Sequence, residues 1–367
     1  MKKICFVSLN AYPLLAKKDI PVAGGAELQL VLIARKLVKK GYHISFVTYD
    51  FGQKEVEIID KIKIIKAFKR TSKNRFSRYL YEKKELFKAL QKANAQIYHQ
   101  RSGSYLTGLV AKFCKKNNKK FIFSIAHIWQ CKKSFLNSMN FFTRSLYKYG
   151  LDNADVITVQ TEDQKTLLKN DLKKDSIILR NAYFVPNKTF KRKKPETILW
   201  LNTIKEWKKP ETFMEMASLM EDSNFQMIGG PENPNDAYYK RIESAAKHIK
   251  NLEFKGFIPY HKIDRHIEQA SLMVNTSLYE GFPNSLLQAW SKGIPCITLY
   301  VDPDEVVCKY GLGLHAKDFN DLVEKTKNLM KNKKLMLKLG KNAKDYVKKV
   351  HDIDMISKQY EKIYEGI

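Results

Sequence analysis

The stretch at residues 272–300, LMVNTSLYEGFPNSLLQAWSKGIPCITLY, predicts a strand, a sharp turn, a helix and a second strand in succession. The apolar run that ends at Leu278 is long enough for one buried strand, and Pro283 falls where the first position of a helix tolerates proline best. Gly293 ends that helix as a C′ glycine. Strands that alternate with helices in this way build a parallel sheet, so the stretch predicts an α/β fold.

The turn and the start of the helix predict a ligand site. A helix N-terminus directs free N–H groups and the positive end of its dipole beyond the preceding strand, where an anion or a polyhydroxy group binds well. Glu280 lies in the turn, which we expect to be exposed, and Gln288 lies just over one helical turn further on the polar stripe. Together they are placed to hold two separated parts of one ligand. The alternative is an ordinary strand–helix crossover with a surface glutamate.

Glu280-Gly281-Phe282, with a second polar side chain eight positions after the glutamate, resembles the motif of the retaining nucleotide-sugar glycosyltransferases of family 4, which have the two-domain GT-B fold. In that family the first glutamate contacts the donor sugar, and a second glutamate holds the ribose diol. The resemblance gives these roles to Glu280 and to Gln288, whose amide can still accept from and donate to a diol. It also implies donor contacts at the start of the helix, by Phe282, Pro283, Asn284, Ser285 and Leu286.

The length and one linker indicate two domains. A chain of 367 residues exceeds what one hydrophobic core usually serves, and the stretch at 180–196 is polar, basic and carries two prolines. We therefore predict two Rossmann-like domains at 1–182 and 183–348. The resemblance implies that the first binds the acceptor, that the second binds the nucleotide sugar across a cleft, and that a final helix at 349–367 crosses back onto the first domain.

Three strand ends in the first half carry candidate site residues. Gly24-Gly25 follows the first predicted strand and opens a helix, so its backbone can approach a bulky anionic group, although a simple tight turn is the alternative. In family 4 a Gly-Gly-x-Glu at this place lies against the donor diphosphate and the acceptor, and Gly24, Gly25 and Glu27 match it. A histidine after a later strand faces the transferred sugar or acceptor in that family, and His127 fits. Arg101, at another strand end, is our candidate for an acceptor phosphate.

The second half departs from the family pattern at a further position. Family 4 places an arginine and a lysine, five residues apart, after the first strand of this domain, where both hold the donor diphosphate. Here these positions are Thr203 and Lys208, and Lys205 is a candidate substitute for the missing arginine. The turn at Phe257-Ile258 resembles the one that contacts the nucleobase through backbone groups. Recognition by backbone leaves the base unspecified.

The net charge of +28, from 66 Lys and Arg against 38 Asp and Glu, indicates a polyanionic partner. A phosphate-rich ligand or an acidic membrane surface suits this excess, and so does a lysine-rich coat without a specific partner. We expect no nucleic acid, because no nucleic-acid-binding motif accompanies the charge. The predicted helix at 75–93 is the candidate for contact with an anionic membrane, with a solvated face as the alternative. The cations concentrated around its start are Lys66, Lys69, Arg70, Lys73, Arg75, Arg78, Lys83 and Lys84.

Metal and redox signals are weak. The five scattered cysteines lack C-x-x-C spacing and are expected to be reduced core thiols. Asp302-Pro303-Asp304 has the spacing that binds Mn²⁺ or Mg²⁺ in the other large glycosyltransferase fold, but a rigid proline turn explains it better, and we expect no metal and no cofactor. Residues 3–9 are predicted as a first buried strand rather than as part of a signal peptide, and no run approaches the roughly 18 apolar residues of a membrane span.

The resemblance implies a retaining hexosyltransferase, and the excess of cations predicts that it is cytoplasmic and peripheral at the inner face of a membrane. Catalytic roles fall to Glu280, His127 and Lys208, with a UDP- or GDP-sugar as donor and a lipid-linked glycan of cell-surface polysaccharide biosynthesis as acceptor. The alternatives are a GT-B-fold nucleotide-sugar epimerase and a non-catalytic protein that binds nucleotide sugars or polyanions. The sequence specifies neither the sugar, the base nor the acceptor.

Overall fold

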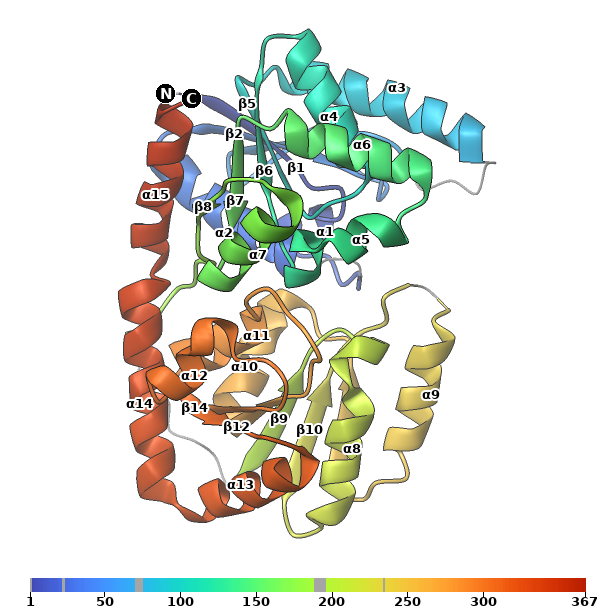
Figure 1. The fold of residues 1–367 in the computed structure, drawn as a ribbon. Coiled ribbons are helices and arrows are strands. Elements are labelled where there is room, and N and C mark those ends of the chain that lie inside the picture. Colours follow the sequence, from blue (N-terminus) through green and yellow to red (C-terminus); the bar gives the residue numbers. More distant parts are fainter. Residues whose placement is uncertain (1, 22–23, 70–74, 188–195, 234) are drawn as a thin grey trace. The chain divides into compact units, whose positions relative to one another are not determined.

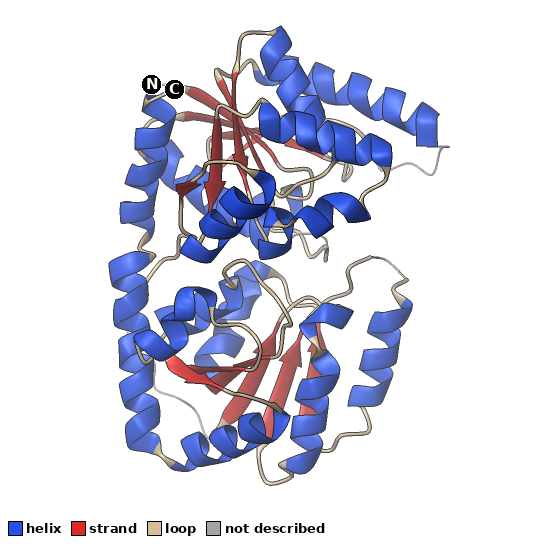
Figure 2. Ribbon diagram, in the orientation of Figure 1, coloured by secondary structure: helices blue, strands red, loops and turns tan. Residues whose placement is uncertain are grey.

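The computed structural model describes residues 2–21, 24–69, 75–187, 196–233 and 235–367, which form two compact units. The first unit holds residues 2–18, 24–182 and 353–367, and the second holds 19–21 and 183–352. Each unit has a mainly parallel sheet covered by helices (Figures 1 and 2), which confirms the predicted α/β architecture. Arg70, Lys73 and residues 188–195 of the predicted linker lie outside the described residues, as does the side chain of Arg75.

The first unit is built on eight strands in the order β3-β4-β2-β1-β5-β6-β7-β8. Neighbouring strands are parallel except for the β3–β4 hairpin. The central strands are apolar on both faces, as expected for a sheet that helices cover on both sides. The strands are β1 (Lys3–Val7), β2 (His43–Thr48), β3 (Val56–Ile59), β4 (Ile62–Lys66), β5 (Ile97–Arg101), β6 (Lys120–Ser124), β7 (Val156–Val159) and β8 (Ile177–Ile178).

The C-terminal helix α15 (Ile353–Glu365) belongs to the first unit, as predicted. It packs against α2, and its Ile356, Tyr360 and Tyr364 lie in the same core as Leu30 and Ile33 of α2. The other helices of this unit are α1 (Tyr12–Leu15), α2 (Gly25–Lys39), α3 (Arg75–Ala93), α4 (Tyr105–Lys116), η1 (Ile128–Cys131), α5 (Lys133–Ser138), α6 (Phe141–Asp152) and α7 (Glu162–Leu172).

The second unit has six parallel strands in the order β11-β10-β9-β12-β13-β14. They are β9 (Thr197–Leu201), β10 (Asn224–Ile228), β11 (Leu252–Gly256), β12 (Ala270–Asn275), β13 (Cys296–Thr298) and β14 (Gly313–His315). The helices are η2 (Glu206–Lys208), α8 (Pro210–Leu219), α9 (Ala237–Ala246), α10 (Tyr260–Gln269), α11 (Asn284–Ser291), η3 (Pro303–Glu305), α12 (Val306–Lys309), α13 (Phe319–Lys331) and α14 (Lys333–Val350).

Some local predictions were wrong. The strand expected to end at Leu278 is β12, which ends at Asn275 because the Asn275 side chain accepts a hydrogen bond of 3.0 Å from the N–H of Ser277 and turns the chain. Pro283 is the N-cap of α11 rather than its first residue. Cys308 is exposed, whereas the other cysteines are buried as predicted. Burial raises the pKa of Cys131, for example, to about 12.

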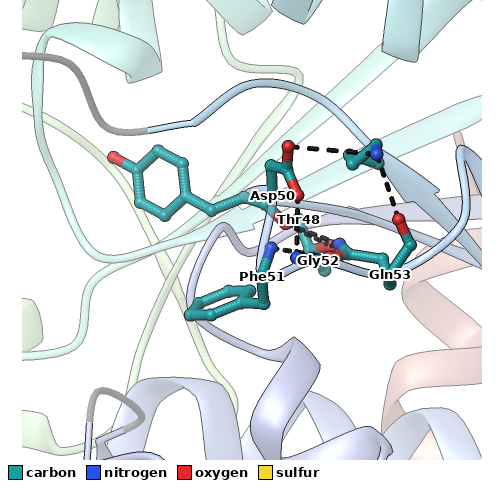
Figure 3. Close-up of polar contacts among 7 residues, drawn as sticks. Thr48, Asp50, Phe51, Gly52 and Gln53 are labelled. Atoms are coloured by element: carbon teal, nitrogen blue, oxygen red, sulfur yellow. Dashed lines mark hydrogen bonds and ion pairs between the residues drawn. The ribbon is translucent and has the colours of Figure 1, made fainter.

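The loop after β2 is held by its own polar groups (Figure 3). The amide of Gln53 donates to Thr48 Oγ1 at 3.1 Å and accepts from the N–H of Phe51 at 2.6 Å. Lys66 donates to the backbone oxygen of Gln53 at 3.0 Å and lies 3.9 Å from the carboxylate of Asp50. Lys66 is therefore tied to this loop and is not one of the free surface cations that the sequence suggested.

Candidate active site

The candidate site of the second unit lies where its strand order reverses. β9 has β10 and β11 on one side and β12, β13 and β14 on the other. Ligands of open parallel sheets bind beyond the carboxyl ends of the strands at such a point. The loop after β9 carries Thr203 and Lys208, and the loop after β12 carries Glu280. The predicted donor residues therefore come from the two central loops.

Lys208 and Glu280 form an ion pair between these two loops, with only 9% of each side chain exposed. The expectation of an exposed Glu280 is wrong, because the loop after β12 folds onto the loop after β9. The N–H of Leu278 donates to the carbonyl of Trp207 at 2.9 Å, and the rings of Trp207 and Tyr279 stack with centroids 5.4 Å apart. These contacts hold both charged side chains inside the second unit.

The electrostatics of this pair favour exchange with a ligand. Burial lowers the pKa of Lys208, and the Glu280 carboxylate opposes that shift. The ammonium also lies 4.0 Å from the centre of the Trp207 ring, whose face attracts a cation. The two buried charges compensate each other in the free protein. A ligand that offers phosphate to Lys208 and hydroxyl groups to Glu280 would supply the same compensation.

Lys205 stands on the same indole ring but makes a different contact. Its ammonium lies 5.8 Å from the Trp207 centroid and pairs with Glu232 at 2.7 Å, with 25% and 52% of the two side chains exposed. Its charge adds to the effect of burial in lowering the pKa of Lys208. A second cation therefore lies close to Lys208, although the family's arginine is replaced by Thr203.

Buried hydroxyl groups surround the start of α11. Ser277 and Ser285 are buried, and within the described ranges neither hydroxyl has a hydrogen-bond partner. Nearly all buried hydroxyls in native proteins are bonded, so these two are candidates for contact with a ligand. Two other predicted contacts face the core instead: Phe282 packs on Trp290 and His351, and Leu286 is fully buried. Only their backbone groups are available to a donor.

Gln288, the predicted ribose contact, is buried beside two tyrosines. Its side chain hydrogen-bonds to the hydroxyl of Tyr183, which lies 3.2 Å from the hydroxyl of Tyr260. Burial raises the pKa of Tyr183 well above its usual value, and the bond from Gln288 lowers it. An amide can both donate and accept, so Gln288 can keep its bond to Tyr183 and still offer a polar atom to a ribose hydroxyl.

The predicted nucleobase turn lies beside two glycines that allow close packing of strand-end loops. A Cβ at Gly229 would lie 2.1 Å from the backbone oxygen of Asn202, and a Cβ at Gly230 would lie 3.0 Å from the Cβ of Phe257. Larger residues would push the loops after β9, β10 and β11 apart. The predicted contacts half-buried in these loops are Thr203, Phe257 and Ile258.

In the first unit, Gly24 and Gly25 lie exposed at the start of α2, after the strand β1 at which the order of the first sheet reverses. The carboxylate of Glu27 accepts a hydrogen bond of 2.9 Å from the N–H of Gly24, which is the glutamate half of a capping box. Glu27 thus stabilises the helix start, while the exposed glycine backbone remains open to an anionic group.

His127 follows β6, as predicted, and its ring orientation is fixed. Nδ1 accepts a hydrogen bond of 3.2 Å from the N–H of Trp129, so the neutral ring carries its proton on Nε2. Gln130 accepts from the N–H of Ala126 at 2.9 Å, and Gln160 donates to the carbonyl of Ala126 at 2.8 Å. The half-buried imidazole is therefore held by its loop, at the carboxyl edge of the first sheet.

Arg101 faces the interior of the first unit. Its Nη2 donates to Asn181 at 2.6 Å, and it hydrogen-bonds to Tyr360 of α15. Burial lowers the pKa of Arg101, while Tyr360 and Glu27 raise it. The guanidinium is buried and binds the C-terminal helix, which favours a structural role for Arg101, and its contact with an acceptor phosphate stays a prediction.

A buried polar row beside Arg101 was not predicted. His99 Nδ1 lies 2.8 Å from the hydroxyl of Tyr364, and Nε2 lies 2.6 Å from Ser124 Oγ, which is 2.6 Å from Thr158 Oγ1. Burial lowers the pKa of His99 to about 3, and the charge of Arg101 adds to this effect. The available signal was a polar residue in each of three predicted buried strands.

In the Asp302–Asp304 segment, the Asp302 carboxylate binds backbone N–H groups. The two oxygens of Asp302 accept from the N–H groups of Val307 at 2.7 Å and Cys308 at 3.2 Å. Pro303 starts the short helix η3 beside it. These contacts support the proline-turn interpretation over a metal-binding one.

The chain matches two family descriptions, one for each half. Residues 23–180 match Glycosyltransferase Family 4, and residues 184–346 match Glycosyl transferases group 1. An uncharacterized glycosyltransferase of Haemophilus influenzae is 25% identical to this chain. The match covers 83% of this chain and 82% of the relative's chain. The N,N'-diacetylbacillosaminyl-diphospho-undecaprenol alpha-1,3-N-acetylgalactosaminyltransferase of Campylobacter jejuni is 29% identical over 46% of this chain and 43% of its own.

Solved structures share the whole fold. Sucrose-phosphate synthase from Thermosynechococcus elongatus superposes with a TM-score of 0.83 at 18% identity, covering 100% of this chain and 99% of that one. Anabaena HepE in complex with UDP and glucose gives 0.78 at 12% identity over both complete chains. The fold is GT-B. The chain belongs to the group 1, family 4 glycosyltransferases and is a retaining enzyme of the hexosyltransferase type that uses a nucleotide sugar.

Proposed function

We propose that this enzyme moves a sugar from a UDP- or GDP-sugar to a lipid-diphosphate-linked glycan at the inner face of a membrane, in cell-surface polysaccharide biosynthesis. The observation that carries the donor assignment is the buried Lys208–Glu280 pair at the strand-order reversal. Complexes of HepE with UDP and with UDP-glucose support the donor class. The name of the Campylobacter relative supports a diphospho-undecaprenol acceptor.

The donor replaces the internal ion pair with ligand contacts. Its diphosphate meets Lys208, the hydroxyl of Ser285 and the free N–H groups of α11, while Glu280 accepts from hydroxyls of the sugar. The carbonyl of Gln288 accepts from the ribose. The ligand keeps both buried charges compensated, so binding avoids the cost of leaving either one alone.

Transfer follows a same-face displacement. The bond between the anomeric carbon and the diphosphate oxygen breaks as the acceptor oxygen bonds to that carbon from the same side. The leaving diphosphate takes the acceptor proton, and Lys208 stabilises its growing negative charge. His127, fixed at the first sheet, positions the sugar or the acceptor hydroxyl.

The charge of the first unit supports the membrane assignment. Lys69, Arg78 and Lys84 are exposed around the start of α3, and each cation near an anionic surface contributes on the order of 1 kcal/mol. No described helix is both long and apolar enough to cross a bilayer. Attachment through surface charge would bring the enzyme to an acceptor embedded in lipid.

A mass-spectrometric screen of the purified enzyme tests this proposal. Each UDP- and GDP-sugar is incubated with a lipid-diphosphate glycan and, in parallel, with the same glycan lacking lipid. We expect one donor class to yield NDP and a lengthened lipid-linked product. An isomerised donor without transfer would indicate an epimerase, and binding without either product would indicate a non-catalytic protein. Preference for the lipid-free glycan would overturn the acceptor assignment.

A further inference from the structure

The first unit carries an apolar surface outside the candidate active site. Phe141 is 85% exposed and Phe142 44% exposed at the first turn of α6, and Leu80 is 49% exposed on the neighbouring helix α3. We call Leu80, Phe141 and Phe142 the aromatic tip. Scattered single apolar residues on a surface are ordinary, but three large side chains on two adjoining helices are not.

The aromatic tip is held in place by the helices beneath it. The ring of Phe142 meets Tyr79 of α3 edge to face, with centroids 4.7 Å apart, which joins the two helices (Figure 1). α6 lies directly against α4: a Cβ at Gly108 would come within 2.1 Å of the carbonyl oxygen of Leu146. Arg144 donates at 3.0 Å to the carbonyl of Met139 in the turn before α6. Phe141 is therefore exposed on a helix that is packed firmly against its neighbours.

Positive charge surrounds the tip. Lys84 is exposed one helical turn from Leu80 on α3, Arg78 is exposed on the same helix, and Lys148 is exposed two turns along α6 from Phe141. The first turns of α3 and α6 contain no acidic residue, although acids there would stabilise a helix. In contrast, α7 of the same unit places Glu162 and Asp163 in its first turn. Exposed apolar side chains surrounded by cations suit a partner that has an apolar interior beneath an anionic surface.

We propose that the aromatic tip enters an anionic lipid bilayer, with Phe141 and Phe142 below the headgroups and the cations of α3 and α6 among the phosphates. A second copy of the chain is a poorer partner, because it would bring another net charge of +28 to the same place. A stable protein interface also needs about 800 Å² on each partner, far more than three side chains supply. Membrane insertion requires neither a large flat area nor an opposing acidic protein.

This inference rests on the proposed attachment to a membrane and names the part of the chain that enters it. Surface cations alone give binding that salt abolishes. Burial of two phenyl rings adds an apolar contribution that salt does not screen, and that corresponds to at least about tenfold in affinity. The two contributions are therefore separable by experiment.

The test compares the full-length enzyme with Phe141→Ser/Phe142→Ser and with Leu337→Ser. Leu337 is a matched control, since it is 65% exposed on α14 and lies among the exposed lysines Lys334 and Lys338, but stands alone. Binding is measured by co-sedimentation with vesicles of phosphatidylcholine and phosphatidylglycerol at low and physiological salt. Circular dichroism and transfer to a lipid-free acceptor analogue report that each variant is folded and active.

We expect the double variant to lose at least about tenfold in vesicle affinity at both salt concentrations, because salt does not screen the apolar contribution, and Leu337→Ser to bind as wild type. Phe141→Trp should show a blue-shifted emission with these vesicles and quenching by brominated lipid. Wild-type binding by a folded double variant, or no binding of the wild type to anionic vesicles at low salt, would overturn the inference. Either result would leave the donor assignment, measured with soluble substrates, unaffected.

Discussion

The strand-end loops of the two units use their charged side chains in different ways. In the second unit, Lys208 and Glu280 compensate each other, the Lys208 ammonium also faces the Trp207 ring, and the hydroxyls of Ser277 and Ser285 are buried without a partner in the described ranges. In the first unit, Arg101 is bonded to Asn181 and Tyr360 although its Nε is buried without a partner among the described residues, and Glu27 caps its own helix.

The difference distinguishes a preformed ligand site, at Lys208 and Glu280, from a structural contact, at Arg101. A ligand can take the place of one side chain of an ion pair and compensate the other. A guanidinium that is bonded to a neighbouring helix would disrupt the packing of that helix if it moved. The donor site that we propose in the second unit is therefore recognisable in the free chain. In the first unit, the exposed backbone at Gly24-Gly25 and the ring of His127 are the groups that we propose to contact a substrate.

The largest expected effect is on catalysis. Glu280→Gln should lower kcat/KM by about 10²- to 10³-fold, because the amide is a weaker acceptor for sugar hydroxyls and no longer balances Lys208. Steady-state kinetics with the identified donor measure this. Glu232→Gln, which breaks the exposed Lys205–Glu232 pair on the same indole ring, should change kcat/KM by less than about threefold. Equal losses in both variants would remove the distinction between the two pairs.

A second expectation concerns stability. Lys208→Met should destabilise the second unit by about 3 kcal/mol, because Glu280 is then a buried charge without its counterion. Lys208→Met/Glu280→Gln should recover most of that loss while remaining inactive. Denaturant unfolding of the single and double variants measures the free energy of coupling between Lys208 and Glu280. Additive losses in the double variant would show that the pair is not coupled.

Prediction from sequence succeeded where chemistry is local and failed where it depends on packing. The turn at Glu280-Gly281-Phe282, the helix start at Gly24-Gly25 and the position of His127 after a strand were predicted correctly, because glycine turns and strand ends are recognisable in a sequence. The burial of Glu280 was not found, because it depends on a hydrogen bond between the loops after β9 and β12, which are about 70 residues apart in the chain.

Arg101 illustrates the same limit. A polar residue at a strand end is equally compatible with a ligand and with a partner from elsewhere in the chain. Its partner Tyr360 lies on a helix that returns from the far end of the sequence, and only the fold brings the two together. The row from His99 to Thr158 was missed although each strand showed a polar residue, because the strands' register was unknown.

The stability of the first unit should decrease in acid, because His99 is buried in it. The pKa of His99 is lowered to about 3 from an ordinary value near 6.5, so below pH 6.5 the unfolded chain takes up a proton that the folded chain does not. Stability is therefore fully present above pH 6.5 and falls by at most about 1.4 kcal/mol per pH unit toward pH 3. Urea unfolding at several pH values should show a shallower slope for His99→Asn than for wild type. An equal slope for His99→Asn and wild type would contradict this assignment.

A smaller effect is expected at the ribose position. Tyr183→Phe removes the hydroxyl that orients Gln288, so the KM for the donor should rise about three- to tenfold with little change in kcat. Gln288→Glu should stay within about threefold of wild type, because a carboxylate accepts from both the ribose and Tyr183. Initial rates over a range of donor concentrations separate these outcomes. A lower kcat with an unchanged KM would place Tyr183 outside donor binding.

The smallest expected effect is that of metal removal. Transfer should survive EDTA, because Lys208 and the start of α11 are assigned the neutralisation of the diphosphate, and both oxygens of Asp302 bond to backbone N–H groups. Assays after dialysis against chelator measure this. Loss of activity that Mn²⁺ restores would return a metal to the donor site.

The most direct measurement of the central claim is calorimetric titration of wild type, Glu280→Gln and Lys208→Met with the donor sugar nucleotide and with the corresponding free nucleoside diphosphate. If the buried pair is the donor site, Glu280→Gln weakens the sugar nucleotide by about tenfold and spares the diphosphate, whereas Lys208→Met weakens both. Wild-type affinity of both variants for both ligands would contradict the claim that Lys208 and Glu280 hold the donor.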